Sequence, residues 1–85
     1  MGATSTMTLY GTSACHLCDE AQELLSTVLA DRPLWRYRIV DISESDLLFE
    51  RYGLLIPVLA LADGRELRWP FNVEALAAFL DSAPE

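Results

Sequence analysis

The chain has 85 residues, of which 52% are hydrophobic and 22% charged, and a formal net charge of −7 at pH 7. This composition predicts one folded domain, over 7–85 after a flexible leader of 1–6, and excludes an intrinsically disordered chain. The negative charge argues against nucleic acid and anionic membranes as partners. All positive charges are arginines, which excludes lysine Schiff-base chemistry. With neither a signal peptide nor a long apolar run, we expect a cytoplasmic protein. We also expect it to be a monomer.

The first predicted elements are a strand, a helix and a second strand. A strand is expected over 7–10. Apolar residues spaced by three and four then predict a helix over 15–30. Its expected inner face consists of Leu17, Ala21, Leu24, Leu25, Val28 and Leu29. A second strand over 34–42 becomes apolar on both faces at Ile39 and Val40, which is typical of a covered strand.

The second half of the chain predicts two helices around a hairpin. The expected elements are a short helix opened by residues 43–46 and running to about 52, strands over 57–62 and 65–69, and a final helix over 72–82. Ser43 is the expected cap of the short helix and Gly53 its stop. Asp63-Gly64 is a strong hairpin signal. Asn72 should cap the last helix, whose expected inner face is Val73, Leu76, Ala77 and Leu80.

The order of these elements predicts an α/β fold of the form βαβ-α-ββα. The first two strands flank a helix, so they should run parallel with a right-handed crossover. The hairpin adds antiparallel strands. We therefore expect one mixed four-stranded sheet flanked by helices.

Two cysteines, Cys15 and Cys18, are three residues apart where the first helix should begin. The free N–H groups and positive dipole end of a first helical turn stabilise a thiolate at Cys15. Cys18, one turn deeper, should be more buried and keep its proton longer. The spacing of about 5–6 Å also suits a disulfide. The sequence therefore predicts thiol–disulfide exchange in which Cys15 attacks and Cys18 resolves.

Two other functions stay open for this motif. A metal site within one chain lacks ligands, because the cysteines and His16 supply at most three of the four that zinc needs. Two chains could still share a zinc or iron–sulfur site through their cysteines. The second alternative is an adaptor that binds a partner around Pro57, Trp69 and Phe71 without redox turnover. For His16 we favour a solvated surface position, and for the two aromatic residues core packing.

Proline is found only at special positions in a sheet, such as the first residue of a strand, because its nitrogen cannot donate a ladder hydrogen bond. From the residues alone, Pro57 is simply the first residue of the third strand. If the Ile56–Pro57 bond were cis, the backbone of Ile56 would face an incoming peptide, but few X–Pro bonds are cis.

From about Met7 to Leu80 the chain resembles the glutaredoxins of the thioredoxin-fold superfamily, especially the small bacterial glutaredoxin-like proteins. The resemblance rests on residues 9–18, which read Leu-Tyr-Gly-Thr-Ser-Ala-Cys-His-Leu-Cys, and on residues 40–42 and 51–58 before the hairpin. It implies a thioredoxin-like fold and exchange through the two cysteines, often with glutathione as reductant. It also implies a cis Pro57 beside Cys15. The expected substrate contacts are His16, Leu17, Ile56 and Pro57.

The chain departs from the glutaredoxin pattern at three places. Glutaredoxins usually have Pro and Tyr between the cysteines, where this chain has His16 and Leu17. No basic residue precedes Cys15, and the Gly-Gly-x-Asp element before the last helix is absent. Asn72 and Val73 are the remaining candidate glutathione contacts. The expected partners are protein disulfides or a small thiol such as glutathione, together with a cellular reductant, and no resident cofactor or metal is expected.

Overall fold

The structure is a computed structural model that describes residues 5–13 and 15–81. Its elements in chain order are β1 (Ser5–Gly11), α1 (His16–Leu29), β2 (Trp35–Asp41), η1 (Ile42–Glu44), α2 (Asp46–Tyr52), β3 (Val58–Leu61), β4 (Glu66–Arg68) and α3 (Val73–Asp81). The predicted order is confirmed. The first strand begins earlier than expected, so Ser5 and Thr6, assigned to the leader, belong to β1, while 1–4 lie outside the described residues. None of the helices in the described part is long and apolar enough to cross a membrane.

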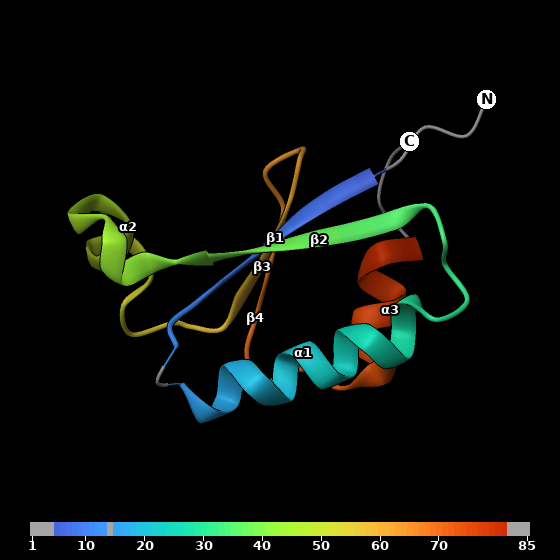
Figure 1. Cartoon of the computed structure of the whole chain (residues 1–85). Helices are drawn as coiled ribbons and strands as arrows, with labels where there is room; N and C mark the ends of the chain where they lie inside the picture. Colours follow the sequence, from blue (N-terminus) through green and yellow to red (C-terminus); the bar gives the residue numbers. More distant parts are fainter. Residues whose placement is uncertain (1–4, 14, 82–85) are drawn as a thin grey trace.

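The four strands form the predicted mixed sheet, in the order β2-β1-β3-β4. β1 and β2 run parallel, and β3 is antiparallel to both β1 and β4. The hairpin turn between β3 and β4 places Gly64 at φ +96°, a left-handed conformation that glycine adopts without steric cost. Figure 1 shows α1 and α3 along one side of the sheet and α2 near one end of β2.

The main core lies between one face of the sheet and the helices α1 and α3. Its buried residues from these elements are Met7, Leu9, Leu59, Leu61, Ala21, Leu25, Val28, Leu76 and Leu80. Two expected inner-face residues are instead exposed: Leu17 by 42% and Val73 by 41%. Both lie in the first turn of a helix, where side chains tilt toward the helix start and away from the packed body.

A smaller apolar cluster lies under α2 on the other face of the sheet. It buries Ile42, Tyr52 and Val58. The ring of Tyr52 stacks on Tyr10 with 4.3 Å between centroids, and its hydroxyl donates to the Glu66 carboxylate at 2.5 Å. Burial, followed by this hydrogen bond, raises the pKa of Tyr52 to about 12. The cluster thus fixes α2 against the sheet.

The predicted cap of α2 is wrong. Asp41 caps the short helix η1 by accepting the N–H of Ser43 at 2.9 Å, so Ser43 lies inside η1. Ser45 then caps α2 by accepting the N–H of Leu48 at 3.3 Å. Gly53 follows the last residue of α2, as predicted.

β2 is not the covered strand that its apolar end predicted. It lies at the edge of the sheet, and the side chain of Ile39 is 52% exposed. Trp35 and Tyr37, earlier in β2, do pack against the main core. The buried strand positions come from β1 and β3, which are the inner strands and therefore have a neighbour on each side.

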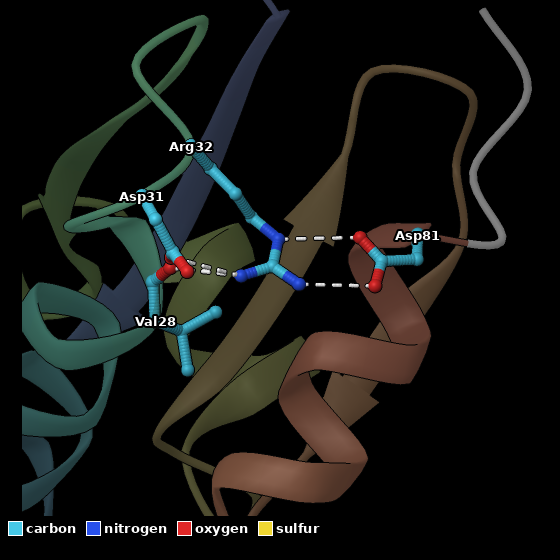
Figure 2. Close-up of polar contacts among 4 residues, drawn as sticks. All are labelled: Val28, Asp31, Arg32 and Asp81. Carbon is cyan, nitrogen blue, oxygen red and sulfur yellow. Dashed lines mark hydrogen bonds and ion pairs between the residues drawn. The ribbon is translucent and has the colours of Figure 1, made fainter.

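Arg32 joins the end of α1 to the end of α3 (Figure 2). Its guanidinium donates through Nε and Nη2 to the two carboxylate oxygens of Asp81, at 3.2 and 3.0 Å. Nη1 donates to the carbonyl of Val28 at 3.0 Å and lies 3.4 Å from Oδ1 of Asp31. The hydrogen bond with Arg32 lowers the pKa of Asp81. This contact holds the ends of α1 and α3 together, at the end of α1 opposite the cysteines.

Candidate active site

The cysteine motif lies at the end of β1, where three segments meet. β1 ends at Gly11, and Cys15 is the N-cap of α1. β3 begins at Val58, which pairs with Tyr10 across the antiparallel ladder. Pro57, one residue earlier, therefore lies at the same end of the sheet as the cysteines.

Cys15 caps α1 through its sulfur. The residue is extended, with φ −96° and ψ 110°, and Sγ accepts the N–H of Cys18 at 3.2 Å. Oxygen usually fills this role at an N-cap. The amide donor and the positive end of the helix dipole would both stabilise a negative charge on Sγ. Cys15 is only partly buried. The geometry therefore places a hydrogen-bonded sulfur at a position that a substrate can reach.

Cys18 faces the interior and is only 4% exposed, so it is the more buried thiol, as predicted. Burial, followed by a hydrogen bond with Cys15, raises the pKa of the Cys18 thiol to about 11. Gly11 makes room for it, because a Cβ at that position would lie 2.7 Å from Sγ of Cys18. Both cysteines are free thiols.

The two residues between the cysteines lie on the surface. His16 is exposed, as expected, and its Nε2 is 3.2 Å from Oε2 of Glu20, one helical turn further on. Leu17 presents an apolar side chain beside Cys15. Neither side chain is buried in the fold, so both are available to a bound substrate.

The Ile56–Pro57 peptide bond is cis, which confirms what the resemblance implied. Pro57 is buried and Ile56 is half-buried. The N–H of Ile56 donates to the carbonyl of Tyr52 at 3.1 Å, so the backbone group that Ile56 can offer a peptide is its own carbonyl. The Trp69–Pro70 bond is also cis, which the sequence reasoning did not anticipate.

The two candidate glutathione contacts begin α3. Oδ1 of Asn72 accepts the N–H of Ala75 at 2.8 Å, which confirms the predicted cap. Asn72 was a candidate glutathione contact, and this bond already engages its side-chain oxygen. Val73 is the first residue of α3 and is 41% exposed.

Trp69 and Phe71 pack as core residues, as expected. Phe71 is buried in the main core, Trp69 packs against it, and the rings meet edge to face with centroids 5.0 Å apart. They also line a hollow of about 420 Å³ between α1 and the segment before α3. The facing wall comes from α1 and includes Glu20, Glu23 and Leu24. We call this the α1–Trp69 hollow.

Sequence reasoning missed this hollow. Glu20 lies on the face of α1 that lines the hollow, near the start of the helix. Only the fold brings that helix face to Trp69, which is 49 positions away in the sequence. The available signal was a pair of glutamates at the flank of the apolar face of α1.

No group of three or more His, Cys, Asp or Glu side chains in 5–13 and 15–81 is placed to hold a metal ion. The alternative of a metal site shared by two chains through Cys15 and Cys18 stays open.

Comparison with known proteins places the chain in a family. A model described as a glutaredoxin-like domain (DUF836) matches residues 6–81. The chain therefore belongs to this family of glutaredoxin-like domains. A comparison with functionally curated proteins gives no match.

Solved structures show the same thioredoxin-like fold. The X-ray structure of protein XcR50 from X. campestris is 44% identical, with a TM-score of 0.82, and the match covers 92% of this chain and 99% of that one. Thioredoxin 2 from Pseudomonas aeruginosa PAO1, in its reduced form, is 27% identical with a TM-score of 0.73, over 94% and 79% of the two chains. Protein Ne2328 from Nitrosomonas europaea is 21% identical, with a TM-score of 0.75 over 93% and 94%, and shares the fold.

Proposed function

We propose that this domain is a dithiol thiol–disulfide oxidoreductase, with Cys15 as nucleophile and Cys18 as resolving thiol. The observation that supports it most strongly is the pairing of an accessible sulfur with a buried one. Sγ of Cys15 accepts the Cys18 amide at the start of α1, and Cys18 lies directly behind it in the interior.

The proposed reaction has two exchange steps. The Cys15 thiolate attacks one sulfur of a substrate disulfide, so that a mixed disulfide forms and the second substrate sulfur leaves as a thiolate. Cys18 then loses its proton to solvent and attacks Sγ of Cys15, which expels the first substrate sulfur. The substrate gains two electrons and becomes a dithiol, while Cys15 and Cys18 become a disulfide. An external reductant restores the starting state.

The contact between the two thiols also orders these steps. In the reduced state burial is the largest cause of the raised pKa of Cys18, and the hydrogen bond with Cys15 and the charge on Cys15 add to it. A mixed disulfide at Cys15 carries no charge, so these two contributions end when the first step is complete. Cys18 then loses its proton more readily, at the point where the second step needs a thiolate.

The proposed partners are protein disulfides or small thiols, within a reducing compartment such as the cytoplasm. No resident cofactor takes part in the scheme. Glutathione is the weaker candidate reductant, because the chain is acidic and the oxygen of Asn72 already caps α3.

The test uses the oxidised protein and two reducing systems, each with NADPH consumption as readout. One is glutathione with its reductase, and the other is thioredoxin with thioredoxin reductase. We expect at least one system to reduce the protein catalytically. Cys15→Ser should abolish exchange, whereas Cys18→Ser should accumulate a mixed disulfide at Cys15. Reduction by neither system, or full exchange activity in Cys15→Ser, would contradict the proposal and favour the adaptor.

A further inference from the structure

We propose that the α1–Trp69 hollow binds an arginine or lysine side chain of a substrate protein, two to four residues from the cysteine that Cys15 attacks. This inference rests on the proposed function and specifies the substrate class.

The chemistry of the walls selects a cation with an aliphatic stem. On the α1 side, Glu20 and Glu23 supply carboxylates and Leu24 an apolar surface. On the other side, Trp69 and Phe71 supply aromatic surface, over which a guanidinium or ammonium group is attracted by the ring quadrupole. The described lining residues include no cationic side chain. Long basic side chains match this pattern, because their stems pack on apolar surface while the charged end reaches carboxylates.

One wall carboxylate already has a histidine side chain of the same chain beside it. Oε2 of Glu20 lies 3.2 Å from Nε2 of His16. Among the described residues, no ion pair involves the carboxylate of Glu23, so this group is the more available partner for an incoming charge. The net charge of −7 favours approach of a basic segment from a distance.

The position of the hollow sets the spacing on the substrate. On the α1 side its lining runs from Glu20 to Thr27, and the two carboxylates belong to Glu20 and Glu23, five and eight residues after Cys15. At a rise of about 1.5 Å per residue, these carboxylates lie roughly 7–12 Å from Cys15 along α1. An extended substrate covers that length with about two to four residues. The exposed Leu17 lies one turn before Glu20 on the same side of the helix, so the path from Cys15 to the hollow passes over an apolar side chain.

The test compares matched peptide probes. Each peptide carries one cysteine, activated as a mixed disulfide with 2-mercaptoethanol. The peptides have either Arg or Glu three residues from that cysteine, and a third peptide carries its Arg eight residues away. The rate of transfer to the Cys18→Ser protein is measured, because this variant holds the mixed disulfide at Cys15. We expect the near-Arg peptide to react about tenfold faster than the Glu peptide at low salt, with the difference shrinking at high salt.

Two variants with equal charge change separate the hollow from general attraction. Glu20→Gln with Glu23→Gln should lose most of the preference for near Arg. Glu44→Gln with Glu50→Gln removes the same charge at exposed positions outside the hollow. This second variant should retain the preference for near Arg. Equal rates for the Arg and Glu peptides, equal rates for near and far Arg, or equal losses in the two variants would overturn the proposal.

A binding measurement keeps the test independent of exchange. The near-Arg peptide with Ser in place of Cys is titrated into the wild-type protein, and NMR shifts are followed. The expected shifts are at the indole N–H of Trp69 and the amides of Glu23 and Leu24. If hydroxyethyl disulfide, the simple disulfide of 2-mercaptoethanol, fails to react with Cys15, the proposed function is contradicted. The titration then tests by itself whether the hollow binds the basic side chain. No shifts at these groups with millimolar peptide would overturn it.

Discussion

The position of the Cys18 side chain depends on a neighbouring glycine, Gly11. The space for its sulfur exists because residue 11, at the end of β1, is a glycine. The sulfur also lies behind Cys15, whose Sγ accepts the Cys18 amide. Cys18 is thus positioned by the strand before it as well as by the helix that contains it.

Gly11→Ala should therefore impair the second exchange step. The added Cβ would lie 2.7 Å from Sγ and 3.2 Å from Cβ of Cys18, so Cys18 has to shift. Overpacking of this kind costs about 1–3 kcal/mol of folding free energy. We expect a lower denaturation midpoint and slower release of a mixed disulfide preformed at Cys15, measured by rapid quench and mass spectrometry. Ser13→Ala, at an exposed loop position, is the control. Unchanged release and unchanged stability would show that Gly11 does not confine Cys18.

At the scale of elements, periodicity and turn residues predicted most of the fold. The spacing of the apolar positions in α1, the Asp63-Gly64 turn and the Asn72 cap act over a few residues, and the structure confirms each of them. The motif Cys15-x-x-Cys18 was interpretable for the same reason, since its chemistry depends on one helical turn.

The incorrect predictions concern structural features that the neighbouring residues in the sequence do not determine. Asp41, Ser43 and Ser45 are all suitable caps, and the extra turn of η1 determines which of them act. Whether Ile39 is covered depends on its strand being at the edge, which follows from strand order rather than from hydropathy. The hollow beside Trp69 needs two distant segments to meet.

At the scale of the whole molecule, Arg32 links the first and last helices by a two-pronged contact with Asp81 (Figure 2). The cysteines lie at the other end of α1, so this contact contributes to folding stability without touching the site. Because the carboxylate is hydrogen-bonded in the folded state, its contribution depends on pH.

Asp81→Asn should lower the melting temperature at neutral pH but not at low pH. The folded-state pKa of Asp81 is below its ordinary value of 3.8. Its stabilising contribution is therefore complete above that ordinary value and is lost as pH falls through the folded-state pKa. Melting curves from pH 7 to about pH 2 should show wild type and variant converging. Asp31→Asn, at a mostly exposed neighbour of Arg32, should change less. A constant difference at all pH values would mean that the carboxylate charge is not responsible.

The central claim is that Cys15 and Cys18 have different roles, and their relative alkylation rates test it most directly. The reduced protein is exposed briefly to iodoacetamide from pH 6 to 11, and modification at each cysteine is quantified by fragment-ion mass spectrometry. The accessible sulfur at the start of α1 should react at least tenfold faster than the buried one at pH 7. Cys18 should gain reactivity only as pH approaches the value of about 11 to which its pKa is raised. Equal rates for the two cysteines, or faster modification of Cys18, would contradict the account.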